Sequence, residues 1–353
     1  MTNLYEAHHQ WAVRPPDERF PSLESLHEYV KARRDQSFEE SRRLSQVEVK
    51  LLPDGNLGVN GEQPVASFTN WSFGQLALIA GAPARYLRTL SPDLTRDCLK
   101  HGLAKSDGSY RLLVRGSYNG SVNSQAAAFT SDSYGRIWDI DVLSSLVEGV
   151  KDSGWHMPKA QDQNGSGNAG LYASDRDMFV FMVNDEKPVE VGNARLGRGF
   201  FCWNSETGSA TFGLTTFLYN YVCGNHIVWG AEDVNELRII HRTHAFDRFY
   251  HEALPVLNRF VESRSESSRI QNMVSEAMSR TLAPELPGLL KWSEGRPFTK
   301  REITQAWELA QADGDDPSTA WGLVQGLTAY ARQIKHTDSR VNLERRAGSL
   351  LKS

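Results

Sequence analysis

From Gln46 to about residue 240, segments with alternating polar and apolar residues recur, which is the pattern of β-strands with one buried face. Such segments flank a PDGN turn at residues 53–56 and an NGS turn at residues 119–121. Both turns contain residues that readily adopt hairpin-loop conformations, so the pattern predicts two strand pairs. A third hairpin is predicted around residues 175–177, and aromatic and β-branched residues predict further strands up to about residue 240.

Apolar residues at three- and four-residue spacing predict helices between and after these strands. Four helices are predicted in the first half of the chain, at residues 22–34, 70–80, 92–103 and 139–151. From Phe246 onward the spacing stays helical, with a capping box from Thr299 to Glu302. A last helix after Pro317 carries an apolar stripe that is expected to dock on the core. Its members are Trp321, Val324, Leu327, Thr328 and Ala331.

Strands in the middle of the chain and helices at its end predict an α+β fold. We expect an antiparallel-rich β core with flanking helices and a helical C-terminal region. At 353 residues the chain is long enough for about two domains of ordinary size. The pattern divides it into an N-terminal arm or helix at 1–45, a core domain at 46–250 and a helical region at 251–353.

Composition narrows the classes of protein to be considered. Hydrophobic residues make up 40% of the chain and charged residues 23%, values typical of an ordered globular protein. The net charge of −4 gives no global basic field, so affinity for nucleic acid would need a local basic patch. No stretch reaches the length of about 18 apolar residues that a membrane span needs, and the polar start lacks a secretory signal. We therefore expect a cytoplasmic protein without membrane contact.

The cysteines and glycines exclude several common cofactor sites. Cys98, Cys202 and Cys223 form an odd set without a CxxC pair, which predicts neither a disulfide framework nor a cysteine-rich zinc site. The sequence also contains neither GxxxxGK(S/T) nor GxGxxG, the common phosphate-binding loops. We expect unpaired thiols, no metal and no cofactor.

Residues 200–230 are unusual because polar residues interrupt a strongly β-forming, aromatic sequence. The interrupting residues are Asn204, Ser205, Glu206 and Asn225. In one interpretation they are turn residues, and Asn204 and Glu206 hold the turn between two adjacent strands. In the other interpretation they form a surface for a ligand. The pattern favours the turn.

The same region supplies a candidate catalytic site. Residue types that form nucleophilic or acid–base sites are present at Cys223, His241, His244 and Glu206. Cys223 and His226 have the spacing of half a zinc site. His241 and His244, however, would lie on opposite faces of a predicted strand, so no metal centre is predicted. A hydrolase or transferase that uses these residues is the main alternative function.

Basic residues gather locally despite the acidic total. Residues 100–120 contain four lysines and arginines against one aspartate. Arg111 and Arg115 are separated by an even number of positions in a predicted strand, so they are expected to share one face. Aromatic residues beside arginines on a β surface stack with the bases of single strands. We therefore predict a nucleic-acid-binding surface formed by Arg111, Arg115, Tyr118, Arg195 and Arg198.

Several motifs follow one another from about Phe68 to the C-terminus. They include AAFTSDSYGRIWDIDVLSSL, WNSETG, YVCGNHIVW, IIHRTH and STAWGLVQGLTAY. In this order they resemble the phage/plasmid-like domain of unknown function 932 family. The residues that carry the resemblance most specifically are Ser131, Asp132, Tyr134, Asn204, Ser205, Glu206, Gly208, Cys223 and Asn225.

The resemblance implies a role in the DNA metabolism of a mobile genetic element, without assigning an activity. A β-sheet core with flanking helices is also similar to the fold of single-strand annealing recombinases, which form rings, so a homo-oligomer is a further expectation. Our leading hypothesis is a phage or plasmid protein that binds single-stranded DNA in recombination or replication. The alternatives are the enzyme above and a host-interaction protein that acts through exposed aromatic residues.

Overall fold

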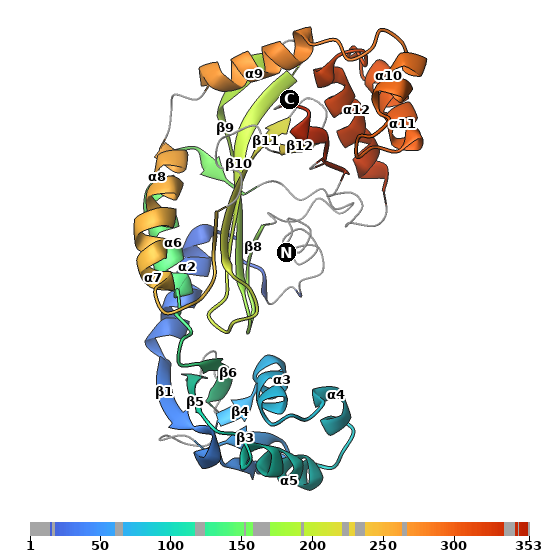
Figure 1. Ribbon diagram of the computed structural model, residues 1–353. Coiled ribbons are helices and arrows are strands. Elements are labelled where there is room, and N and C mark those ends of the chain that lie inside the picture. The colour runs from blue at the N-terminus through green and yellow to red at the C-terminus, as the bar shows by residue number, and fades with distance from the viewer. Residues whose placement is uncertain are drawn as a thin grey trace.

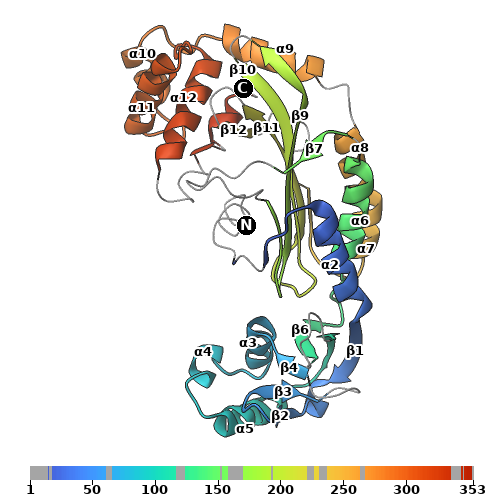
Figure 2. The ribbon, with the colours of Figure 1, turned by 180° about the vertical axis from the view of Figure 1, so that it is seen from behind.

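The chain folds into two β-sheets placed end to end, followed by a helical region at the far end (Figure 1). A computed structural model describes residues 15, 18–60, 66–116, 124–151, 153–157, 170–191, 194–220, 226–229, 237–262, 267–334, 343–344 and 346–351. Both views show the two ends of the molecule curving toward the same side (Figure 2). No helix among the described residues is long and apolar enough to cross a membrane.

The N-terminal module, residues 37–131, is a six-stranded sheet with the order β1-β5-β6-β4-β3-β2. Its strands are β1 (Ser37–Arg43), β2 (Val49–Leu51), β3 (Leu57–Val59), β4 (Ala66–Phe68), β5 (Ser109–Arg115) and β6 (Gln125–Ser131). β4 and β6 are parallel, and the other neighbours are antiparallel. An apolar core joins one face of this sheet to α3 (Asn70–Ile79), α4 (Ala84–Leu87) and α5 (Pro92–Leu103).

The central sheet has seven strands, and each is antiparallel to its neighbours. They are β7 (Trp155–His156), β8 (Leu171–Ala173), β9 (Met178–Val191), β10 (Ala194–Asn204), β11 (Phe212–Asn220), β12 (His226–Trp229) and β13 (Leu237–Ile239). One face packs on α2 (Leu23–Asp35), α6 (Asp139–Val150), α7 (Ala245–Arg248), a π-helical turn (Phe249–Ala253) and α8 (Leu254–Glu262). Alternation along β10 places Cys202 in that core, whereas Phe201 and Trp203 join an aromatic cluster on the opposite face.

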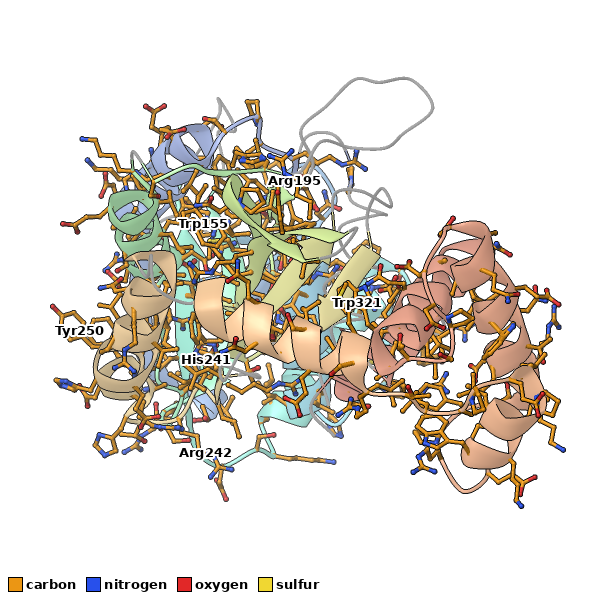
Figure 3. All side chains as sticks on the ribbon, turned by 90° about the horizontal axis from the view of Figure 1, so that it is seen from above. Trp155, Arg195, His241, Arg242, Tyr250 and Trp321 are labelled. Carbon is orange, nitrogen blue, oxygen red and sulfur yellow. The ribbon has the colours of Figure 1, made fainter. Side chains whose placement is uncertain are left out.

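The C-terminal helices form a third apolar core at the end of the molecule. They are α9 (Ser267–Ser279), α10 (Leu286–Trp292), α11 (Lys300–Ala312) and α12 (Ala320–Gln333). The predicted stripe of α12 is buried, and Trp321 lies on the side of these helices that faces the central sheet (Figure 3). Leu196 at the start of β10 belongs to the same core, so this strand spans from the C-terminal helices to the N-terminal module.

The α+β fold predicted from the sequence is confirmed, and most local signals act as expected. The PDGN turn joins β2 to β3, and Ser91 caps α5 with proline at its first position. The capping box of α11 is formed by Thr299 and Glu302. Thr69 caps α3, and α12 begins after its cap at Thr319, two residues beyond Pro317.

Tertiary packing gives two segments a role that their local pattern did not show. The predicted N-terminal arm or helix at 1–45 contains the expected helix, α2, which packs on α6, and also an unpredicted strand, β1, which pairs with β5 along seven positions. The predicted core at 46–250 contains two separate sheets with separate apolar cores. The join between these sheets is where the polar motif residues gather.

Candidate functional site

The loop between β10 and β11 carries a run of polar residues into the protein interior. Asn204, Ser205, Glu206 and Thr207 are each no more than 2% exposed. The loop lies at the end of the central sheet that faces the N-terminal module (Figure 1). Buried polar groups cost free energy unless they are hydrogen-bonded or paired, so their partners decide what the loop does.

Glu206 binds two arginines from two different elements. Arg115 at the end of β5 donates from Nη2 to Glu206 Oε2 at 2.9 Å. Arg33 near the end of α2 places Nη2 3.7 Å from the same oxygen. All three side chains are at most 8% exposed. The carboxylate therefore joins the N-terminal sheet to a helix that packs on the central sheet.

Asp139 extends this cluster to the start of α6. Its carboxylate lies 2.6 Å from Arg33 Nη2, and its backbone N–H donates to Glu206 Oε1 at 3.0 Å. The first N–H groups of a helix lack partners within the helix, and a carboxylate satisfies them well. Asn204 Nδ2 donates to Asp139 Oδ1 at 2.6 Å and to the Ile137 carbonyl at 2.9 Å. We call Arg33, Arg115, Asp139, Asn204 and Glu206 the junction cluster.

The two carboxylates of the junction cluster have opposite pKa shifts. Burial raises the pKa of Asp139 to about 7, and the nearby Glu206 charge adds to this rise against the opposing effect of Arg33. Burial also acts to raise the pKa of Glu206, but Arg33 and Arg115 together hold it below its ordinary value. The arginines therefore favour the anionic form of Glu206, whereas burial and the Glu206 charge disfavour the anionic form of Asp139.

The backbone of the same loop holds α3 of the N-terminal module. The Thr207 carbonyl accepts from Trp71 Nε1 at 3.1 Å and from Gln75 Nε2 at 2.9 Å. Tyr134 donates its hydroxyl to the Ser205 carbonyl at 2.8 Å. Side-chain and backbone contacts together make this loop a polar joint between the two sheets.

The structure corrects the expectation that Asn204 and Glu206 hold the turn itself. Both side chains leave the loop and bind Asp139 and the arginines. Ser205 stabilises the turn instead, because its Oγ accepts from the N–H groups of Thr207 and Ser209 at 3.2 and 3.0 Å. Sequence spacing could not distinguish these roles, since all three are polar residues at a strand end.

The described members of the predicted catalytic set do not meet. Glu206 binds the two arginines, whereas His241 Nδ1 lies 3.1 Å from the Gly135 carbonyl and its ring stacks on Tyr134. Burial lowers the pKa of His241 to about 4. His244 is exposed, with Nδ1 3.4 Å from Asp247 Oδ2. Cys223 lies outside the described residues, among which no group of three metal-binding side chains occurs.

The predicted nucleic-acid-binding residues are distributed over the molecule. Arg111 is partly exposed on β5, but Arg115 is 7% exposed and belongs to the junction cluster, which removes it from any phosphate-binding surface. Arg195 is exposed at the other end of β10 (Figure 3), and Arg198, three positions further along that strand, is partly exposed. Between Arg195 and Glu206 the chain advances roughly 30 Å at the usual rise per strand residue. Tyr118 lies outside the described residues.

Of the remaining motif residues within the described part of the chain, Asp132 has hydrogen-bond partners and Gly208 has a conformational role. Ser131 and Asp132 are exposed at the end of β6, and the Asp132 carboxylate accepts from Ser41 and Ser109. Gly208 has a positive φ of 82°, which glycine adopts without strain. Asn225 lies outside the described residues.

Sequence reasoning missed a ladder of cations and aromatic rings beside the junction. The Arg34 guanidinium carbon lies 3.9 Å from the centre of the Trp138 ring, and that of Arg136 lies 5.4 Å from the same ring. Arg136 also lies 5.2 Å from the Tyr134 ring. The only local signal was the sequence RIWD before a helix, because Arg34 is contributed by a distant segment.

Comparisons with known proteins give one finding. Residues 127–351, more than half of the chain, match the family model described as Domain of unknown function (DUF932). The matched segment contains Tyr134, Asp139 and the whole of the loop after β10, whereas Arg33 and Arg115 precede it. No curated protein and no solved structure matches the chain.

Proposed function

Since the chain belongs to the DUF932 family, whose description assigns no activity, we propose from the molecule's own surfaces that it binds single-stranded nucleic acid. The surface that supports this proposal is the outer face of the N-terminal sheet, opposite α3, α4 and α5. The wider role that we propose, in recombination or replication of a phage or plasmid, follows from the family resemblance of its motifs.

One observation carries the proposal: the half-buried Trp138 ring has two guanidinium groups over it, that of Arg34 at 3.9 Å and that of Arg136 at 5.4 Å from the ring centre. Trp138 packs against a small apolar cluster on the outer face, which contains Leu113 of β5. Arg111 is two positions before Leu113, so alternation places its side chain on the same face. The Trp138 ring, the partly exposed Arg34 and Arg111 and a β surface therefore lie together, whereas Arg136 is 6% exposed and donates to Glu39.

This combination fits a single strand better than a duplex. An unpaired base can stack on the plane of the partly exposed Arg34 guanidinium or pack edge-to-face against the exposed part of the Trp138 ring, while neighbouring phosphates bind the guanidinium groups. The Arg34 side chain donates to the Ser37 carbonyl through Nη1, which fixes it beside Trp138. The surface is thus ordered before the strand arrives, which reduces the entropy lost on binding.

The test is a salt titration of binding to a fluorescently labelled oligothymidylate. Two phosphate contacts, by Arg34 and Arg111, predict a slope of log affinity against log salt near −1.4, at about −0.7 per contact. Arg111→Ala should flatten this slope by about 0.7. Trp138→Leu keeps an apolar side chain over Leu113 and should lower affinity roughly tenfold, because a stacked base contributes about 1–3 kcal/mol.

Arg301→Ala is the matched control, since Arg301 is an exposed arginine on α11 in the C-terminal region. It should leave both affinity and slope unchanged. Arg195→Ala shows whether the strand extends along β10 toward the far end. Absence of binding by wild-type protein at low salt, or full affinity in Trp138→Leu, would reject the proposal.

A further inference from the structure

A pocket in the N-terminal module lies apart from both the junction cluster and the proposed strand-binding face. Its volume is about 440 Å³, which is within the usual range for small-molecule sites. The lining comes from the β2–β3 turn, the end of β4, the start of α3 and the segment around α4. Those elements lie on the helix-covered side of the sheet, whereas Trp138 lies on the other side.

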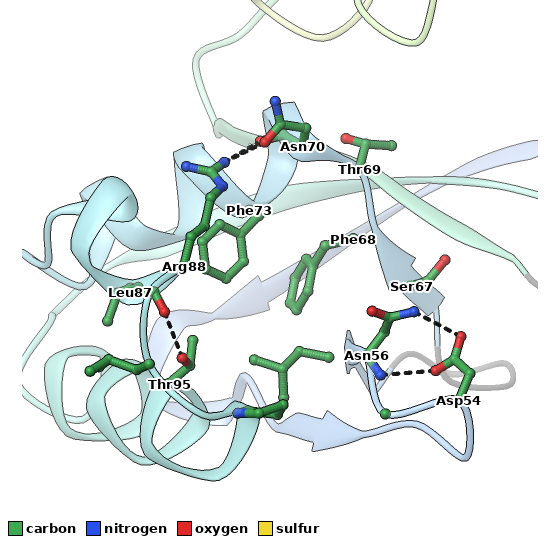
Figure 4. Close-up of a pocket in the computed structure, with 14 residues that line it drawn as sticks. Asp54, Asn56, Ser67, Phe68, Thr69, Asn70, Phe73, Leu87, Arg88 and Thr95 are labelled. Atoms are coloured by element: carbon green, nitrogen blue, oxygen red, sulfur yellow. Dashed lines mark hydrogen bonds between the residues drawn. The ribbon is translucent and has the colours of Figure 1, made fainter.

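Two aromatic rings stand in the middle of the pocket wall (Figure 4). Phe68 and Phe73 have ring centroids 6.1 Å apart with the planes inclined at 72°, and both side chains are partly exposed. Leu57, Leu87 and Leu90 add aliphatic surface. Partly exposed aromatic rings in a concave apolar wall favour a flat ligand.

Opposite charges stand on either side of these rings. The Arg88 guanidinium lies 4.9 Å from the centre of the Phe73 ring, and its Nη2 donates to the backbone and side-chain oxygens of Asn70. Asp54 stands across the pocket, where Asn56 donates to both carboxylate oxygens at 3.0 Å (Figure 4). These hydrogen bonds orient both charged groups before any ligand binds, and they lower the pKa of Asp54.

We propose that this pocket binds a nucleoside monophosphate, with the phosphate on Arg88, the base against Phe68 and Phe73, and base N–H groups directed to Asp54. Guanidinium groups are well matched to phosphate oxygens, and aromatic rings stack with any base. An α-amino acid fits less well, because its two charges share one carbon and cannot reach both sides of the rings. No phosphate-binding loop is needed, so the absence of the common motifs from the sequence does not bear on this site.

Guanine is the base that best matches Asp54. Its neighbouring N1–H and N2–H groups can donate to the two oxygens of one carboxylate, whereas uracil offers a single ring N–H between two carbonyl groups. Each Asp54 oxygen retains acceptor capacity beyond its bond to Asn56. We therefore use guanosine 5′-monophosphate as the probe.

The experiment is calorimetric titration of the full chain with guanosine 5′-monophosphate, guanosine and inorganic phosphate. The nucleotide should bind saturably, and each of the two fragments should bind at least tenfold more weakly. Arg88→Gln should reduce nucleotide affinity roughly tenfold while leaving the affinity for guanosine unchanged. Asp54→Asn should weaken the binding of both the nucleotide and guanosine. Phe73→Leu should also weaken the binding of both, because it removes the aromatic ring but keeps an aliphatic side chain in the pocket wall.

Arg85→Gln is the matched control, because Arg85 is an exposed arginine on the same short helix but does not line the pocket. It should bind like the wild type, and melting curves should show every variant folded. An equal loss of nucleotide affinity in Arg85→Gln and Arg88→Gln would show that the effect comes from net charge and not from the position of Arg88. That result would overturn the proposal. So would the absence of nucleotide binding at millimolar concentration. Neither result depends on the oligothymidylate experiment, because Trp138, the residue tested there, lies on the other face of the sheet.

Discussion

Arg111 and Arg115 lie on the same strand and, by alternation, on the same face, yet their environments are opposite. Arg111 is partly exposed, whereas Arg115 is 7% exposed and bound to Glu206 and to the Asp175 carbonyl. Four residues along β5 thus separate a side chain available to a ligand from one that fastens two parts of the protein. The difference arises from what lies beyond the end of the strand, where the central sheet begins.

The comparison shows that the charge of a residue says little about its role until its neighbours are known. Arg115 pairs with a loop that is 91 residues away in the sequence. In water an arginine gains little from a carboxylate, but in the buried junction each charge depends on the other because neither is solvated. The same residue type is therefore a surface cation at one end of β5 and a structural anchor at the other.

The largest expected difference between the two ends of β5 is in stability. Arg115→Ala should lower the free energy of unfolding by about 3–5 kcal/mol, because it leaves the Glu206 carboxylate buried with one of its cations removed. Arg111→Ala should change it by no more than about 0.5 kcal/mol, as is usual for surface positions. Urea unfolding of the two variants measures this directly. A cost below about 1 kcal/mol for Arg115→Ala would show that the junction cluster does not hold the sheets together.

The second prediction concerns the junction cluster at the buried end of β5, where the free energy of unfolding should depend on pH. The folded-state pKa of Asp139 is about 7, above its ordinary value of 3.8, so the folded protein binds more protons than the unfolded chain between these values. The contribution of Asp139 to stability should fall as pH rises through this window, by up to about 1.4 kcal/mol per pH unit. Asp139→Asn should remove this slope in urea unfolding measured from about pH 5 to pH 7. An identical slope in wild type and variant would contradict the assignment.

Asn204→Ala tests the neutral member of the junction cluster. The change removes donors to a buried carboxylate and to the Ile137 carbonyl, and should cost about 2 kcal/mol of unfolding free energy. Asn184→Ala is the comparison, since the Asn184 amide donates at 2.6 Å to the Ser153 carbonyl in a less buried site. Thermal unfolding of both variants should show a larger loss of stability for Asn204→Ala than for Asn184→Ala. A reversed order would indicate that Asn204 contributes through binding of a ligand rather than through the junction.

The smallest expected effect concerns the backbone of the junction loop. Gly208→Ala should cost about 1 kcal/mol, because its φ of 82° is unfavourable for a residue with a Cβ atom. The added Cβ would stand 3.5 Å from the Tyr134 ring, an ordinary contact, so the cost is conformational. Gly74→Ala in α3 should have the opposite sign, since that position is helical with open space around it. Equal melting temperatures for the two variants would contradict this account.

Local sequence determined the elements of this protein. Ser91 and Pro92 specify the start of α5, Thr299 and Glu302 specify that of α11, and the PDGN turn specifies the β2–β3 pair. These features follow from interactions within a few residues, such as a side chain that accepts from a nearby N–H or a turn residue that adopts the required backbone angles. The α+β fold follows from their order along the chain.

Only the tertiary structure decided which polar residues share an environment. The junction cluster takes Arg33 from α2, Arg115 from β5, Asp139 from α6 and Glu206 from the loop after β10, and no spacing in the sequence relates these positions. Phe73 and Asp54 likewise line one pocket although no spacing in the sequence relates them. Burial removes water as an alternative partner, so pairing, pKa and exposure depend on the neighbours in space. Those neighbours are set by how the two sheets pack together, which the alternation of residues along each strand does not encode.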